Sequence, residues 1–304
     1  MMKTWMCLLL AFAVMACEPN NTEEPTPGGE GNQTEQPEQK PNPDPKPEPE
    51  PAPLPEISRE VPACSIAEFT NWQTHFASSD VIGDFSGLCF NKDRSGFIGV
   101  SNYNGRFYNI NFDGTRESKE FLRTGKDMEG VTVDVENDII YACEEGSNWI
   151  WKITEEVTDE GSKWNYKRFY RVVTSGSDNG GLEGITYHNG YLYVANQSPA
   201  ELYIVSVEHE AVAHSYKANF ITECFSDLWF DTTNNTLWAV DAWSDGKEIV
   251  NFTIWGDFIA RFTSPVPWIE GVCIDFENNK AWFACDSTGQ LYSADIVRSE
   301  AAAE

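Results

Sequence analysis

The chain has little positive charge. It contains 21 lysine and arginine residues against 48 aspartates and glutamates, which gives a formal net charge of −27 at pH 7. A surface of this sign repels the phosphates of nucleic acids and of anionic lipid headgroups. We therefore expect no nucleic-acid partner, whereas cations suit such a surface.

Several catalytic motifs are also missing. The sequence has no Gly-x-Ser-x-Gly elbow, no His-Glu-x-x-His pair and no phosphate-binding loop. Its four histidines are His75, His188, His209 and His214, and they hold unrelated places, with His188 in a predicted hairpin turn. The sequence thus gives no support for a nucleophilic triad, although one assembled from distant loops stays open, and catalytic residues remain unknown.

Long hydrophobic runs are confined to the start of the chain. After Lys3, the segment from Trp5 to Met15 is apolar but too short to span a bilayer, as in a signal peptide. It ends in Val14-Met15-Ala16-Cys17, which resembles the bacterial lipobox, where the cysteine is acylated. We predict a lipoprotein signal peptide at residues 1–16 and a membrane anchor at Cys17, the alternative being an ordinary secretory peptide with an incidental cysteine. Glu18, rather than Asp, follows Cys17 and favours the outer membrane of a diderm bacterium, on the periplasmic side or at the cell surface.

Residues 17–62 are dominated by proline, glutamate, asparagine and threonine. Such a segment has little to bury, and alternating prolines keep it extended, so we predict a disordered linker that acts as a semi-rigid spacer. A short disordered tail is expected at residues 299–304. The folded domain is therefore predicted to cover residues 63–298.

That domain lacks any convincing helical period and consists of strands, turns and a repeat. The repeat starts at Ser86, Glu129, Glu183, Ser226 and Glu270, with spacings of 43, 54, 43 and 44 residues. A repeat of about 40–50 residues made only of strands is typical of a β-propeller, with one blade per repeat. The longer second repeat fits an extended hairpin around residues 158–165.

Five copies predict an all-β propeller of five four-stranded antiparallel blades, with a sixth, degenerate blade as the alternative. The chain ends after the third strand of the last repeat. We expect the segment from Ala67 to Ser78, which precedes the first copy, to supply the missing outer strand. This N-terminal strand would close the ring and remove the open sheet edge.

The innermost strands of a propeller line its channel, so equivalent positions form a ring. Facing carboxylates repel one another unless protons or a cation relieve the repulsion. An all-oxygen set suits Ca²⁺ and, less well, Mg²⁺. We predict a Ca²⁺ site here, and the alternative is that the glutamates bond backbone N–H groups and bind nothing. The predicted metal ligands are Ser86, Glu129, Glu183, Asp227 and Glu270.

A second ring of polar residues lies where the second strand of each repeat ends. These residues either shape a pocket at one channel mouth or simply start turns. The predicted pocket residues are Asn102, Glu145 (or Glu144), Asn196, Asp241 and Asp286. Three tryptophans in the last two repeats could form a glycan surface, or belong to the core: Trp243, Trp255 and Trp268.

Six cysteines remain beyond the signal region. Cys89, Cys143, Cys273 and Cys285 replace small apolar residues of the repeat, so we predict buried free thiols at these positions. The remaining two are the candidates for a disulfide: Cys64 and Cys224.

The repeated motif carries a resemblance to a known family. The pattern Glu-Gly-hydrophobic-Thr/Cys, seen at Glu129, Glu183 and Glu270 and opened by Phe85-Ser86-Gly87-Leu88, resembles the SdiA-regulated family of β-propellers over most of residues 80–297. That family has no settled activity. More distantly the pattern is similar to gluconolactonase propellers and to phytase-like and esterase-like propellers, which implies a divalent ion at the channel mouth. The histidines and arginines expected of phosphate-handling enzymes are absent from the ring positions.

The sequence motifs and the resemblance are compatible with two functions. The first is an exported, lipid-anchored binding module that docks a small-molecule, glycan or protein ligand on its channel face and uses Ca²⁺ structurally. The alternative is a divalent-metal-dependent hydrolase of an ester, lactone or phosphoester. A propeller fold does not choose between them.

Overall fold

The computed structural model describes residues 51–76, 81–117, 119–159, 161–175, 180–222, 224–241 and 247–299. These residues form twenty β-strands and no helix. Accordingly, no helix in the described ranges could cross a membrane. The predicted signal peptide, Cys17 and most of the linker lie outside the described residues, as do residues 300–304.

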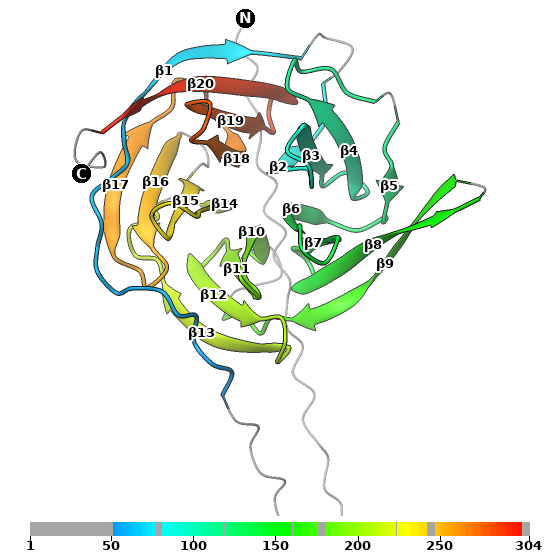
Figure 1. Cartoon of the computed structure of the whole chain (residues 1–304), viewed down its shortest axis with the longest axis horizontal. Coiled ribbons are helices and arrows are strands. Elements are labelled where there is room, and N and C mark those ends of the chain that lie inside the picture. Colours follow the sequence, from blue (N-terminus) through cyan, green and yellow to red (C-terminus); the bar gives the residue numbers. More distant parts are fainter. Residues whose placement is uncertain are drawn as a thin grey trace, which may run out of the picture. The chain divides into compact units, whose positions relative to one another are not determined.

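The strands make five four-stranded antiparallel blades arranged around a central channel (Figure 1). Blade one contains β2 (Phe85–Phe90), β3 (Gly96–Ser101), β4 (Arg106–Asn111) and β5 (Leu122–Arg123). Blade two contains β6 (Met128–Asp134), β7 (Ile139–Glu144), β8 (Trp149–Thr158) and β9 (Gly161–Arg171). Blade three contains β10 (Leu182–His188), β11 (Tyr191–Asn196), β12 (Glu201–Ser206) and β13 (Ala211–Lys217). Blade four contains β14 (Phe225–Asp231), β15 (Thr236–Asp241), β16 (Glu248–Thr253) and β17 (Phe258–Thr263).

Blade five closes the ring with strands from both ends of the domain. It contains β18 (Ile269–Asp275), β19 (Lys280–Cys285), β20 (Gln290–Arg298) and, outermost, β1 (Ile66–Thr74). β1 runs antiparallel to β20, and Figure 1 shows it on the outside of that strand. The prediction of five blades closed by an N-terminal strand is confirmed.

The long second repeat is a projecting hairpin. β8 and β9 pair from Trp149 opposite Arg171 to Thr158 opposite Gly161, with one register shift between Ile150 and Trp151. Figure 1 shows their far ends extending beyond the ring. The extra residues therefore lengthen an outer hairpin and leave the channel unchanged.

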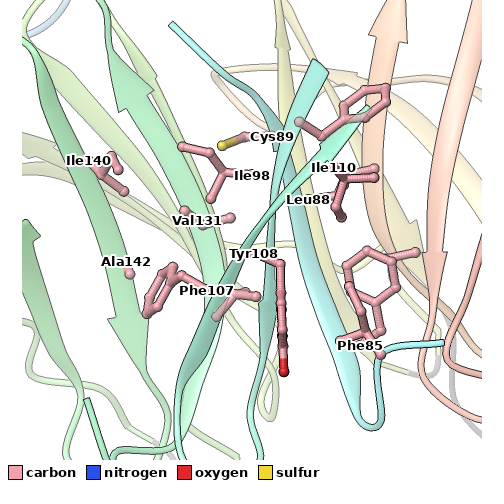
Figure 2. Close-up of a cluster of buried hydrophobic side chains, with 14 of the residues drawn as sticks. Phe85, Leu88, Cys89, Ile98, Phe107, Tyr108, Ile110, Val131, Ile140 and Ala142 are labelled. Atoms are coloured by element: carbon pink, nitrogen blue, oxygen red, sulfur yellow. The ribbon is translucent and has the colours of Figure 1, made fainter. Parts of the chain in front are cut away.

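The core lies between the blades. Four clusters of buried apolar side chains form, and each takes its residues from neighbouring blades. Figure 2 shows part of one cluster, with Ile98 and Phe107 of blade one lying toward Val131 and Ala142 of blade two. Because each sheet is covered on both faces, the second strands read as continuous buried runs rather than alternating ones.

The six cysteines among the described residues are reduced. Cys89, Cys143, Cys273 and Cys285 are buried as free thiols, as predicted. Cys64 and Cys224 are also free, so the candidate disulfide does not form in this structure.

A short N-terminal segment lies against the rim of blades three and four. The Tyr191 hydroxyl donates to the Pro53 carbonyl at 3.1 Å, and the Trp255 indole N–H donates to the Ser58 carbonyl at 3.0 Å. The Arg59 guanidinium lies 4.0 Å from the centre of the Trp255 ring. These contacts involve the last residues of the predicted linker, residues 17–62. Trp255 therefore holds a segment of its own chain, and Trp243 lies outside the described residues.

Candidate functional site

A bulge recurs in the innermost strand of every blade. Pairing with the second strand shifts register at the same repeat position in β2, β6, β10, β14 and β18. A bulge leaves a residue unpaired and re-aims its side chain. The re-aimed positions are the repeat starts: Ser86, Glu129, Glu183, Ser226 and Glu270. The repeated glutamates thus sit where the inner strands begin, at one mouth of the channel.

The glycine after each glutamate allows the inner strands to touch. A Cβ on Gly130 would lie 2.4 Å from the Glu183 carbonyl oxygen, and one on Gly184 would lie 2.6 Å from the Asp227 Cα. Real Cβ atoms do not approach backbone this closely, so glycine is required by contact between neighbouring blades. The channel is therefore narrow at this level.

At the position of this glycine, blade four carries Asp227. This carboxyl is 1% exposed, and its Oδ2 accepts the Val272 N–H from the neighbouring blade at 2.9 Å. Burial raises the pKa of Asp227 well above its usual range, and the hydrogen bond from the Val272 N–H acts in the opposite direction. Asp227 thus accepts an N–H group from the inner strand of the neighbouring blade. This arrangement satisfies channel-facing backbone rather than offering a ligand to solvent.

Three carboxylates meet at the mouth beside blade two. One oxygen from each of Asp127, Glu129 and Glu145 lies within 4.8 Å of the other two. Glu129 is buried at the β6 bulge, Glu145 is half-buried just after β7, and Asp127 is exposed just before β6. The Glu145 N–H donates to the Asp127 carbonyl at 3.0 Å, which fixes the two loops together. None of the ion pairs within the described ranges involves these three residues.

The cluster is electrostatically strained. Burial, followed by the charge of Asp127, raises the pKa of Glu129 to about 8, and the charge of Glu145 adds to the rise. Hydrogen bonds from the side chains of Ser86 and Asn102 act in the opposite direction. Burial is also the main cause that raises the pKa of Asp127 and of Glu145. Without a cation, the site holds protons at neutral pH that an exposed carboxyl would have lost.

Glu183 and Glu270 extend this acidic system around the mouth. Burial raises the pKa of Glu183 well above its usual range, and the charges of Glu129, Glu145 and Glu270 add to it. The pKa of Glu270 is raised in the same way, first by burial and then by the charge of Asp286. The titrations of Glu129 and Glu183 are therefore coupled to those of neighbouring carboxyls.

The predicted pocket residues divide into two sets. Glu145, Asn102 and Asp286 act on the glutamates at the mouth. Asp241 is fully buried and accepts the Thr222 and Cys224 N–H groups. Asn196 is also buried and donates to the Pro199 carbonyl at 2.8 Å. Asp241 and Asn196 therefore form hydrogen bonds with the backbone of nearby loops.

Glu144 and His188 have partners outside the acidic cluster. Glu144, the alternative to Glu145, accepts the Trp151 indole N–H at 2.9 Å. This hydrogen bond joins two strands of blade two, β7 and β8. His188 is the last residue of β10 rather than part of the following turn, and it stacks on Phe230 at 4.1 Å, at the far end of the inner strand. It contributes nothing to the acidic mouth.

Asp127 is the residue that sequence reasoning missed. It lies two positions before Glu129, and Asp84 holds the same place before Ser86. Asp84 in turn raises the pKa of Asp286 by its charge, after burial. Extending the repeat comparison by two residues upstream would have found both aspartates.

Comparison with known proteins bears mainly on the fold. A protein-family model described as SdiA-regulated matches residues 69–225. No curated protein matches the sequence. Glutaminyl cyclase of Myxococcus xanthus is a similar solved structure, with 12% identity and a TM-score of 0.56 over 79% of this chain and 100% of that chain. A gluconolactonase of Xanthomonas campestris has 12% identity and a TM-score of 0.49 over 77% and 91% of the two chains. Virginiamycin B lyase of Staphylococcus aureus has 16% identity and a TM-score of 0.43 over 69% and 66%. At such identities, the likeness concerns the fold alone.

Proposed function

This chain belongs to the SdiA-regulated family, and we propose that it is a binding module with one divalent cation, Ca²⁺, at the acidic mouth of its channel. The observation that carries the proposal is the approach of Asp127, Glu129 and Glu145 to within 4.8 Å of one another. Ca²⁺ is bound by six to eight oxygens, and three carboxylates with water can supply them.

The donor set fits a hard cation. All three side chains offer oxygen only, and neither thiolate nor imidazole belongs to the cluster. The raised pKa of Glu129 shows that its charge lacks compensation within the protein. A bound cation would supply that compensation and release the proton.

The position also suits a ligand. Asp127 is exposed and Glu145 is half-buried, so a cation held there would keep a side open to solvent. Asn102 and Asp286 flank the same mouth and could contact a molecule that docks on it. We infer that the small-molecule, glycan or protein ligand of this module is recognised on this face, through the cation and these polar groups.

Calcium titration of the mature chain tests the proposal. In about 0.15 M salt, which screens diffuse attraction to the acidic surface, we expect one saturable site. Asp127→Asn and Glu145→Gln should each weaken it by about tenfold or more. Glu277→Gln, an exposed acid in the turn after β18, is the matched control and should leave the affinity unchanged. Absence of a saturable site, or equal weakening in the control, would contradict the proposal.

A second candidate function is the metal-dependent hydrolysis of an ester, lactone or phosphoester. It is favoured by one observation, the buried Glu183 carboxyl next to the three proposed ligands, whose pKa burial raises well above its usual range. A carboxyl with a raised pKa can hold a proton at neutral pH and exchange it with a reacting molecule. A screen of the three substrate classes, with Glu129→Gln and Glu183→Gln as variants, separates the candidates. Turnover that needs both calcium and Glu183 would establish the hydrolase, and turnover that survives both substitutions would refute this mechanism.

We further propose that acylated Cys17 anchors the protein in the outer membrane. The support is the apolar run followed by small residues and a cysteine at residues 5–17. Labelling with a radioactive fatty acid should mark the parent and fail to mark Cys17→Ser. Equal labelling of the variant would contradict acylation at this residue.

A further inference from the structure

A cavity of about 280 Å³ lies at the other end of the channel. It is lined by the far ends of the inner strands β2, β6, β10 and β14 and by the turns that follow them. The acidic mouth lies where these strands begin, so the two sites occupy opposite ends of the same strands. Cavities that bind small molecules start at about this size.

The repeat explains why the cavity exists. At the fourth position of the inner-strand motif, four blades carry a small residue and blade four carries Trp229. The small residues that line the cavity at this position are Cys89, Thr132 and Thr186. They leave space, and the half-buried indole of Trp229 forms one wall of it. An aromatic platform surrounded by small side chains suits a planar ring.

The floor of the cavity is apolar. It is formed by residues at the third position of the motif, including Leu88, Ile185 and Leu228. These side chains therefore offer hydrocarbon to an occupant. A ligand here would therefore gain from burying a ring or a hydrocarbon body.

The rim of the cavity is positive, in contrast to the whole chain. Two charged residues line it, Lys92 and Arg94, and both are basic. Each has one carboxylate neighbour: Lys92 Nζ lies 2.8 Å from Asp138, and Arg94 lies 3.9 Å from Asp275. Asp275 also accepts the Glu277 and Asn278 N–H groups. The side chains of Lys92 and Arg94 are about half exposed, at 53% and 50%, and can turn toward a ligand.

We propose that this cavity binds a small aromatic anion, whose ring lies against Trp229 and whose negative group meets Lys92 and Arg94. The hydroxyls of Thr186 and Thr232 line the same space and offer hydrogen bonds to further polar groups of the molecule. The site is separate from the proposed cation site and does not depend on it.

A pair of fluorescent probes tests the proposal on the mature chain. Anilinonaphthalenesulfonate is an aromatic anion, and phenylnaphthylamine is its uncharged analogue. Titrations with chelator present remove any contribution of a divalent cation. The expected result is one site that binds the sulfonate about tenfold more tightly than the neutral probe, although the protein carries a net charge of −27. A neutral probe that binds equally well or better would overturn the anion assignment.

Two matched pairs of variants locate the site. Thr232→Trp fills the rim of the cavity at an exposed position and should abolish binding of both probes, whereas Thr233→Trp, on the exposed neighbour outside the lining, should not. Arg94→Gln should lower the affinity for the sulfonate by about tenfold and leave the neutral probe unaffected. Arg298→Gln is its control, because both guanidinium groups lie over a phenylalanine ring, that of Arg94 4.2 Å from the centre of Phe90 and that of Arg298 4.5 Å from the centre of Phe276. Binding that is unchanged in Thr232→Trp would overturn the location.

Discussion

The acidic mouth should make the metal-free protein less stable as pH rises. The perturbation is a change from pH 5 to pH 9 in the presence of chelator. The pKa of Glu129 is about 8 in the folded state against 4.5 for an ordinary glutamate, so between these values the folded state holds a proton that the unfolded state has lost. Stability from this group is therefore fully present below about pH 4.5 and is lost as pH rises toward and through 8.

The size of the loss follows from the shift. Each pKa unit corresponds to about 1.4 kcal/mol, so the three units between pH 5 and the Glu129 pKa of about 8 correspond to about 4 kcal/mol as an upper value. For a domain of this size, that free energy lowers the melting temperature by roughly 8–16 °C. Calcium should reverse the trend, because a cation stabilises the ionised carboxylates and binds better as they lose protons.

Thermal melting by circular dichroism at several pH values, with chelator or with calcium, measures this effect. Glu129→Gln should flatten the dependence, because the amide stays neutral at every pH and relieves repulsion on Glu183. A metal-free parent whose melting temperature is unchanged between pH 5 and pH 9 would refute the reasoning. So would a Glu129→Gln variant with an undiminished fall.

Three further predictions concern the parts of the fold that build the site. Gly130→Ala should destabilise the domain by about 3 kcal/mol or more in a denaturant titration, because its Cβ would meet the Glu183 carbonyl at 2.4 Å, whereas Gly146→Ala, with open space around it, should change stability by less than about 1 kcal/mol. Asp227→Ala should cost about 1–3 kcal/mol, because the Val272 N–H loses its acceptor, and Asp227→Asn should retain most of the stability; equal losses in both would contradict the acceptor role. Trp255→Ala should expose the segment around Ser58 to limited proteolysis without loss of calcium affinity, and resistance equal to that of the parent would show that this contact does not hold the segment.

The sequence predicted the fold well because the repeat is strong. The motif at Glu129, Glu183 and Glu270 set the number of blades, and the chain end after the third strand of the last repeat predicted closure by the N-terminal segment. Both predictions depend only on local sequence patterns and on the number of repeats. The bulges were harder to foresee, although a glycine after a glutamate inside a strand was their signal.

The site was predicted less completely because it depends on how blades meet. Glu129 and Glu145 were assigned to different rings, and only the bulge at Glu129 brings them together with Asp127. Asp227 was assigned to the metal ligands by its place in the motif. Its environment is set by the inner edges of other blades, which no local pattern of residues reveals.

The metal content of the mature chain, purified without chelator and measured by elemental analysis, tests the central claim most directly. The account predicts close to one calcium per chain in the parent and in Glu277→Gln, and strong depletion in Asp127→Asn and Glu145→Gln. A metal-free parent that also fails to take up calcium on dialysis would contradict it.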